Sequence, residues 1–302
     1  MDIKQLFPNN NMRIGFGPGI VGYSAKYKKQ PKVSRLYFRV YNKLIGRRLQ
    51  HVSYINSVSN ALKMGYRLID YSAAYGDGRL LGEAIRKSGV PREDLFITTR
   101  VSNGAQRDHK VREQFMTFIH NMGVDYIDLL QFHWPVTDLY LDTWREMEKL
   151  KDEGLVKHLG VANCHQHHLE AIFKICKYRP EVGQFEIHPL FTQKPLIQYY
   201  REQGIIVEAY TPIARYDDRL VRLPLLKRLE KKYNKTFVQI ILRWHVQNGV
   251  IPLVRSLTPK HQQENFDIFN FELDEEDMKV IDGININSRL RYDPDNCDFS
   301  IL

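Results

Sequence analysis

The sequence predicts an α/β fold, a closed (β/α)8 TIM barrel, from two observations. Short apolar runs alternate with amphipathic helical patterns along the 302 residues, and the alternation repeats eight times. Eight such repeats favour a closed parallel barrel over an open sheet. In addition, the one GxGxxG match after a predicted strand, from Gly17 to Gly22, leads into a long basic insertion and not directly into a helix, so an open dinucleotide-binding sheet would lack its usual phosphate loop.

The predicted strands and helices follow one another in a regular order. The strands cover residues 13–17, 67–71, 95–101, 126–134, 156–163, 181–189, 205–213 and 250–256. Amphipathic patterns such as 111–123 and 139–154 lie between them and end at a glycine. Glycine commonly ends a helix because it adopts the left-handed conformation without strain.

Two segments do not fit the alternation, and we interpret them as additions to one barrel domain that covers residues 1–302. Residues 18–52 form a long basic insertion after the first strand, and residues 273–302 form a C-terminal helix and tail. The stretch LDEEDMKVIDGI at the start of the tail has the pattern of a capped helix.

The net charge of +9 is concentrated in one segment. Residues 26–48 carry nine Lys or Arg and no acidic residue, so the positive and negative charges of the rest of the chain are equal in number. We therefore expect no general affinity for nucleic acid. The segment leaves the catalytic end of the first strand, and Arg35, Arg39 and Lys43 recur at helical spacing within it. A clamp for an anionic substrate is the favoured interpretation; a solvated helix on the barrel edge and contact with an anionic membrane surface are the alternatives.

The chain has the features of a cytoplasmic protein. No run reaches the roughly 18 apolar residues of a membrane span, and the first residues lack the apolar core of a secretion signal. Cys164, Cys176 and Cys297 form no CxxC pair, which predicts reduced thiols.

Polar residues end seven successive strands, from the second to the eighth. In a barrel of this kind, the C-terminal ends of the strands form the mouth that carries the active site. One buried polar residue is usually just hydrogen-bonded in the core, but seven on one rim indicate a functional site. They are Asp70, Arg100, His133, Asn163, Gln184, Tyr210 and Arg255.

Eight stretches around these residues resemble the aldo-keto reductase superfamily, in family order and spacing. They are GYRLIDYSAAY, SGVPREDLFITTRVSN, DYIDLLQFHWP, LVKHLGVANC, VGQFEIHP, AYTPIA, ENFDIFNFELDEEDMKVIDGI and the tail RYDPDNCDF, which is similar to that of microbial members. The resemblance implies a barrel that transfers a hydride between NADP(H) and a small carbonyl or alcohol substrate. It also implies a catalytic tetrad of Asp, Tyr, Lys and His.

Carried over by motif, Asp70, Tyr75 and His133 match three tetrad positions, and Trp134 matches a wall of the substrate pocket. Tyr75 is then the general acid or base, which needs a nearby cation to favour its phenolate. The family's Lys is replaced by Arg100, which keeps the charge but does not release a proton. We expect an active reductase with altered chemistry; the alternative is a regulatory or weakly active homologue that binds the cofactor.

The resemblance also assigns the cofactor site. Asn163 and Gln184 match the residues that hold the nicotinamide carboxamide, and Tyr210 matches the residue that stacks on the ring. Arg255 and Ser256 match phosphate-binding positions, which favours NADPH over NADH. The other matched positions are Thr211, Ile213, Leu257, Thr258, His261, where the family has Arg, and the adenine-binding Glu264 and Asn265.

A metal-dependent hydrolase is a third, weak interpretation. His165, His167 and His168 cluster in the stretch HQHH, but no carboxylate at a strand end accompanies them. We interpret them as solvated residues at a helix start and expect no metal.

Overall fold

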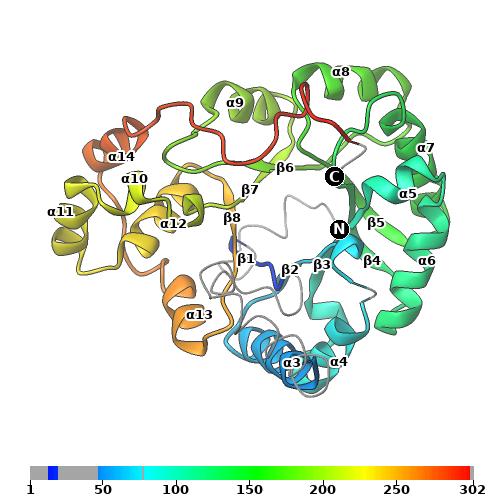
Figure 1. Cartoon of the computed structure of the whole chain (residues 1–302), viewed down its shortest axis with the longest axis horizontal. Helices are drawn as coiled ribbons and strands as arrows, with labels where there is room; N and C mark the ends of the chain where they lie inside the picture. Colours follow the sequence, from blue (N-terminus) through cyan, green and yellow to red (C-terminus); the bar gives the residue numbers. More distant parts are fainter. Residues whose placement is uncertain (1–12, 20–46, 77, 300–302) are drawn as a thin grey trace, which may run out of the picture.

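The strands close into a parallel barrel in chain order, which confirms the predicted fold (Figure 1). The computed structural model describes residues 13–19, 47–76 and 78–299. Each strand pairs in parallel with the next one, and β1 pairs with β8. The strands are β1 (Gly15–Phe16), β2 (Leu68–Asp70), β3 (Phe96–Val101), β4 (Ile127–Phe132), β5 (Val156–Ala162), β6 (Val182–Glu186), β7 (Ile206–Tyr210) and β8 (Ile251–Val254). Every one lies inside a predicted strand.

Helices surround the barrel and cover its outer surface (Figure 1). The α-helices are α3 (Arg47–Lys63), α4 (Arg79–Ser88), α5 (Asn103–Arg107), α6 (Val111–Met122), α7 (Tyr140–Asp152), α8 (Gln166–Ile175), α9 (Lys194–Glu202), α10 (Asp218–Val221), α11 (Pro224–Tyr233), α12 (Phe237–Gln247), α13 (Pro259–Phe266) and α14 (Glu275–Asp282). Three 3₁₀ turns, η4 (Ala73–Tyr75), η5 (Arg92–Asp94) and η6 (Ala214–Tyr216), complete the described elements. As predicted, α6 ends at a left-handed glycine, Gly123, with φ 75°.

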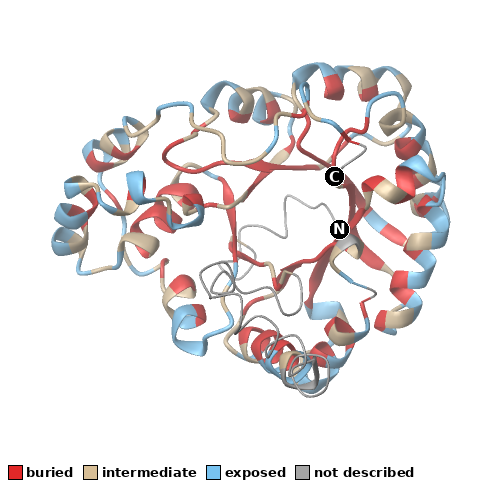
Figure 2. Ribbon diagram, in the orientation of Figure 1, coloured by how far each residue is buried: buried red, intermediate tan, exposed pale blue. Residues whose placement is uncertain are grey.

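Burial follows the barrel layers, with buried strands and helices exposed on their outer faces (Figure 2). The main core lies between the strands and the helices. A second apolar cluster, which includes Leu68, Phe96, Leu129 and Leu253, joins side chains of several strands. Gly15 leaves room for it, because a Cβ there would lie 2.3 Å from Leu68 Cδ2. In β2, the polar Asp70 ends the strand two residues after Leu68 of this cluster.

Of the two predicted additions to the barrel, the structure describes the C-terminal helix but little of the basic insertion. The C-terminal helix is confirmed as α14, and Asp274 caps it by accepting the Asp277 N–H at 2.8 Å. The basic segment 26–48 lies outside the described residues, except for its last two residues. The clamp and the helix that were predicted for this segment therefore also fall outside the described residues. Those last two residues begin α3. The bounds of the insertion, 18–52, stay a prediction.

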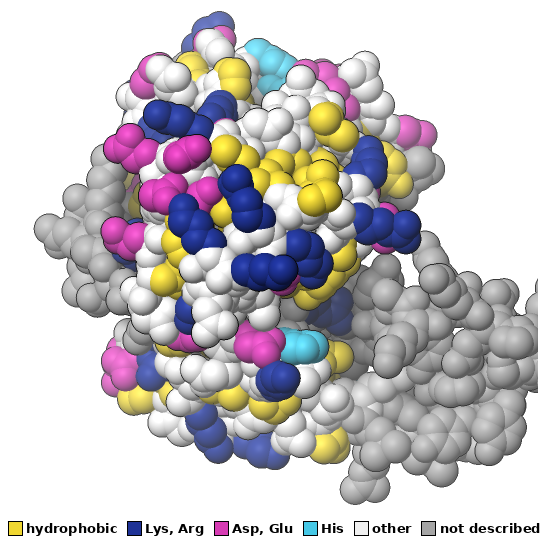
Figure 3. Space-filling model, turned by 90° about the vertical axis from the view of Figure 1, so that its left-hand side faces the viewer, with side chains coloured by type: hydrophobic (Ala, Val, Ile, Leu, Met, Phe, Trp, Pro, Cys, Tyr) yellow, Lys and Arg dark blue, Asp and Glu magenta, His cyan; other side chains and the backbone are white. Residues whose placement is uncertain are grey.

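Three expectations from the sequence concern membrane spans, surface charge and thiols. Among the described helices, none combines the length and the apolar character needed to cross a bilayer. The face formed around α10, α11 and α14 carries Lys and Arg side chains among Asp and Glu (Figure 3). Lys232, for example, pairs with Asp274 and Asp277. The three cysteines are free thiols, and Cys164 is buried.

Candidate active site

Six of the seven polar residues predicted for the strand ends lie at the C-terminal side of the barrel. Asp70 and Tyr210 are the last residues of their strands, and Arg100 is the last but one of β3. The residues His133, Asn163 and Arg255 follow β4, β5 and β8 directly. Gln184 differs, because it lies in the middle of β6 and so deeper in the barrel.

Arg100 and Asp70 form a buried, two-pronged ion pair inside the barrel. Arg100 Nη1 donates to Asp70 Oδ1 at 2.6 Å, and Nη2 donates to Oδ2 at 2.8 Å. Their side chains are only 2% and 9% exposed. Burial alone would lower the pKa of Arg100, but the charges of Asp70, Tyr75 and Glu208 outweigh it and raise that pKa. The guanidinium is therefore a permanent positive charge at this position.

A glutamate that the sequence analysis did not single out completes this network. Glu208 lies in β7, is fully buried, and accepts a hydrogen bond from Gln184 Nε2 at 2.9 Å. Burial, together with the charge of Asp70, raises the pKa of Glu208 to about 7, although Gln184 and Arg100 act in the opposite direction. An acidic residue within the apolar stretch IIVEAY was the sequence signal that could have identified it.

The side-chain amide of Gln184 is hydrogen-bonded inside the barrel. Its Oε1 accepts from Arg100 Nη1 at 2.7 Å, and its Nε2 also donates to Asp70 Oδ1 at 3.0 Å. Both polar atoms of the amide are thus engaged by buried groups, and Gln184 is not among the residues that line the neighbouring cavity. Its predicted contact with the nicotinamide carboxamide stays a prediction, and it requires the amide to turn out of this network.

Tyr75 lies on the cavity wall beside His133. It is the last residue of η4, whose turn is closed by the Tyr75 N–H donating to the Ser72 carbonyl at 2.8 Å. The Tyr75 ring meets the His133 ring edge-on, with centroids 6.0 Å apart. Burial lowers the pKa of His133 to about 3, assisted by the charges of Arg100 and Arg291. His133 is therefore neutral near pH 7.

Asn163 and Tyr210 are tied together and to His133. Asn163 has a positive φ of 58°, which asparagine tolerates better than most residues. Its Nδ2 donates to the His133 carbonyl at 2.9 Å, and its Oδ1 accepts from Tyr210 Oη at 2.6 Å. Tyr210 also lines the cavity. These bonds fix the loops after β4, β5 and β7 relative to one another.

Trp134 packs against the C-terminal tail. Its ring lies 6.3 Å from that of Phe299 and 6.4 Å from that of Tyr292, measured between centroids, and it is buried. The tail is held in place because Arg107 donates to the Phe299 carbonyl and Glu186 accepts the N–H groups of residues 290 and 291. The predicted role of Trp134 as a substrate wall stays a prediction.

A cavity of about 880 Å³ runs from Asp70 and Tyr75 to α13. Most of the predicted cofactor residues line it, namely Tyr210, Thr211, Ile213, Arg255, Ser256, His261, Glu264 and Asn265. Leu257 and Thr258 do not line it and are exposed. The sequence analysis missed Gln262, a buried residue whose Nε2 donates to the Ser57 carbonyl at 2.9 Å and the Ser256 carbonyl at 3.0 Å. Gln262 thereby fixes the turn that carries the predicted phosphate-binding residues.

The histidine cluster differs from its sequence interpretation at one residue. His168 is buried and not solvated. A carboxylate that is not at a strand end, Asp295 of the C-terminal tail, also lies against the cluster, 2.7 Å from His165 Nδ1.

Comparison with known sequences places these features in a family context. The sequence model of the Aldo/keto reductase family matches residues 43–286. An uncharacterized oxidoreductase of Bacillus subtilis, YtbE, is 41% identical over 249 residues, which are 81% of this chain and 88% of that protein. The glyoxal reductase of the same organism is 41% identical over 80% of this chain and 87% of its own length. The 9,11-endoperoxide prostaglandin H2 reductase of Trypanosoma cruzi is 39% identical over 80% and 86%.

Solved structures agree with the sequence comparison. MGS-M4, an aldo-keto reductase enzyme from a Medee basin deep-sea metagenome library, superposes with a TM-score of 0.82 at 34% identity, over 95% of this chain and 96% of that one. A Bombyx mori aldo-keto reductase in complex with NADP superposes with a TM-score of 0.77 at 28% identity, over 93% and 92%.

Proposed function

The chain belongs to the aldo/keto reductase family of NADP(H)-dependent oxidoreductases, and we propose that it reduces a small aldehyde or ketone with Tyr75 as the proton donor. The observation that carries this proposal is the position of Tyr75 on the cavity wall, beside neutral His133 and within the electrostatic reach of Arg100. That the chain acts in the cytoplasm, as a single domain, remains a prediction from its sequence.

In the proposed reaction, the cofactor supplies the hydride and the protein supplies the proton. NADPH, when bound, supplies the hydride that adds to the carbonyl carbon. Tyr75 Oη donates its proton to the carbonyl oxygen, so the C=O bond becomes an alcohol and a phenolate remains on Tyr75. Water then returns the proton to the phenolate. In the reverse direction the same phenolate accepts the alcohol proton.

Arg100 and His133 have different roles in this step. The fixed positive charge of Arg100 stabilises the developing phenolate, and the two bonds to Asp70 hold the guanidinium in place. Because the pKa of His133 is low, at about 3, the ring does not act as an acid near pH 7. A neutral imidazole can still donate one hydrogen bond and orient the carbonyl oxygen.

The cavity suits NADP(H) on two grounds. It joins the reacting end to the start of α13, where Arg255 and Ser256 can hold a phosphate dianion. In addition, Thr211 Oγ1 is buried and has no hydrogen-bond partner among the described residues, although the residue lines the cavity. A buried hydroxyl without a partner is costly, and a bound polar ligand would satisfy it.

An anionic carbonyl compound is the narrower proposal for the substrate. Arg291 of the tail lines the cavity and, within the described ranges, has no carboxylate partner. The names of relatives, such as glyoxal reductase, indicate small carbonyl compounds. The second candidate is a regulatory or weakly active homologue that binds the cofactor but turns over substrate slowly, because Arg100 replaces the family's lysine.

NADPH consumption measured against a carbonyl panel tests the proposal. The panel contains glyoxal, neutral aldehydes and ketones, and 2-oxo acids, so that it compares neutral with anionic substrates. Tight NADPH binding without turnover of any carbonyl would favour the second candidate. Reduction of neutral carbonyls alone would contradict the anionic substrate.

The variant Tyr75→Phe tests the proton donor. It should slow the chemical step by about 10²-fold or more, while NADPH binding, followed by cofactor fluorescence, is retained. Turnover close to that of the wild type would end this assignment.

A further inference from the structure

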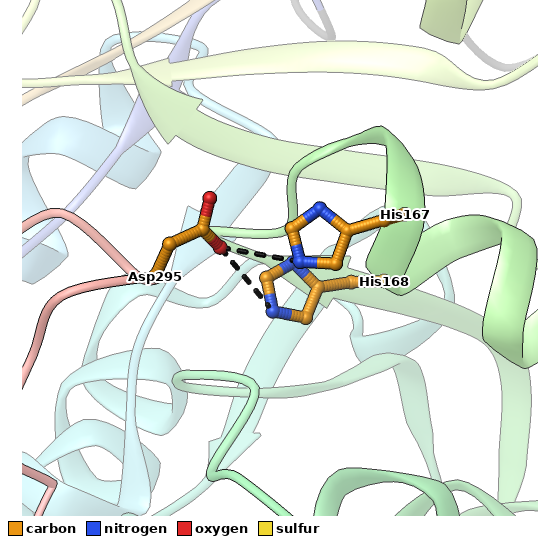
Figure 4. A group of neighbouring side chains, drawn as sticks. All are labelled: His167, His168 and Asp295. Atoms are coloured by element: carbon orange, nitrogen blue, oxygen red, sulfur yellow. Dashed lines mark ion pairs between the residues drawn. The ribbon is translucent and has the colours of Figure 1, made fainter.

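Three histidines at the start of α8 lie near two aspartates of the C-terminal tail. Figure 4 shows three of these residues, His167, His168 and Asp295. His165 precedes the helix, and His167 and His168 lie in its first turn. Asp295 contacts two of these rings, at 2.7 Å from His165 Nδ1 and 3.2 Å from His167 Nε2. The donor atoms of His165, Asp293 and Asp295 lie within 4.8 Å of one another, and those of His167, His168 and Asp295 form a second group of this kind.

We propose that His165, Asp293 and Asp295, joined by His167 once its ring turns toward them, bind a divalent transition-metal ion, with Zn²⁺ as the natural probe. Imidazole nitrogens and carboxylate oxygens are the donors that such ions take in proteins. Metal–ligand bonds of about 2.0–2.2 Å place neighbouring donors about 3.3 Å apart in a tetrahedral site. Asp295 Oδ2 lies 2.7 Å from His165 Nδ1 and Oδ1 lies 3.2 Å from His167 Nε2, so each oxygen is near this spacing from one ring, and a metal would be held through both oxygens or after the carboxylate turns.

His168 is left out of the ligand set by its tautomer. Its Nδ1 accepts the backbone N–H of His165 at 3.1 Å, so the proton of the neutral ring is on Nε2. That Nε2 faces Asp295 Oδ1 at 3.8 Å and has no lone pair for a metal. His168 instead caps α8 and packs against His167, with ring centroids 4.0 Å apart.

The charge of the site favours a cation, with one opposing group. Two carboxylates face two imidazoles, and Asp295 is partly exposed, so an ion can reach it. Arg289 opposes binding, because its Nη2 lies 3.4 Å from His165 Nε2. A metal on Nδ1 requires the ring proton to be on Nε2, so that Arg289 must turn away. Removal of this positive charge should therefore strengthen the site.

An ion at this site would join the tail to the barrel. Asp293 and Asp295 precede Phe299, whose ring packs on Trp134 next to the active site. Because metal binding to the native state alone raises its stability, occupancy should appear as a higher melting temperature.

Zinc binding to the full chain, measured by competition with a chromophoric chelator, tests the proposal. His167→Ala and Asp295→Asn should each weaken Zn²⁺ binding by about tenfold or more, since even the loss of indirect partners costs 10–100-fold. Arg289→Gln should bind Zn²⁺ more tightly than the wild type. His120→Ala, which removes an exposed histidine at the end of α6, is the matched control and should bind as the wild type does.

Melting curves complete the test and guard against misfolding. Without metal, the variants should melt within a few degrees of the wild type, and added Zn²⁺ should raise the melting temperature of the wild type but not of His167→Ala. Equal Zn²⁺ affinity in the wild type, His167→Ala and Asp295→Asn would overturn the proposal. So would loss of binding in Cys297→Ser together with unchanged binding in His167→Ala.

Discussion

The two ends of the active-site cavity hold their charged side chains in different ways. At the reacting end, Arg100 is buried and bonded to Asp70 and Gln184. At the other end, Arg255 lines the cavity and is exposed, and exposed Lys260, which does not line the cavity, lies 3.8 Å from Glu264. A buried charge is costly unless it is paired, whereas exposed pairs contribute little to stability. Charges at the reacting end should therefore affect both the fold and the chemistry, and those at the far end only ligand binding.

The largest effect is expected for Arg100→Met, which leaves Asp70 buried without its cation. Unfolding by denaturant should show a loss of about 3–5 kcal/mol, the usual result when one partner of a buried pair is removed. The double variant Asp70→Asn with Arg100→Met should recover much of this loss, because it leaves no uncompensated charge from the pair. Equal destabilisation in the single and double variants would show that the loss comes from packing and not from charge.

A smaller effect at the same end is expected from Glu208→Gln. The pKa of Glu208 is raised to about 7 in the folded chain from an ordinary value of 4.5, so the folded state retains a proton that the unfolded state loses between these values. Stability should therefore fall as the pH rises through this window, by about 3 kcal/mol at most.

The glutamine variant keeps an acceptor for Gln184 but does not ionise. Its stability at pH 8 relative to pH 5, measured by chemical denaturation, should exceed that of the wild type. If both proteins show the same pH dependence, Glu208 does not titrate in this range.

The smallest effect is expected at the exposed end, from Arg255→Gln. NADPH binding should weaken about tenfold, which corresponds to 1.4 kcal/mol, while NADH binding and the melting temperature stay nearly unchanged. Lys260→Gln is the matched control, because it removes an exposed positive charge from the same segment. An equal loss of affinity for NADPH and NADH would remove Arg255 from the 2′-phosphate site.

The sequence predicted the barrel and most of the mouth because both depend on local patterns. Apolar runs define the strands, and parallel strands bring their C-terminal ends together. The contact between Asp70 and Arg100 could therefore be predicted from the sequence. The orientation of the Gln184 side chain could not be predicted from the sequence, because it depends on how far the guanidinium of Arg100 extends into the barrel. The contact between His165 and Asp295 joins positions 130 residues apart in a helix start and an irregular tail, for which no periodicity exists.

The pH profile of carbonyl reduction tests the central claim, that Arg100 acts on the proton donor through its charge. The wild type, Arg100→Lys and the double variant Asp70→Asn with Arg100→Met are compared by kcat/KM, with melting curves to confirm that each is folded. Loss of the cation disfavours the phenolate, so the alkaline limb should move to higher pH in the double variant, with slower turnover, and should stay in place in Arg100→Lys. An alkaline limb at the same pH in all three proteins would contradict the account.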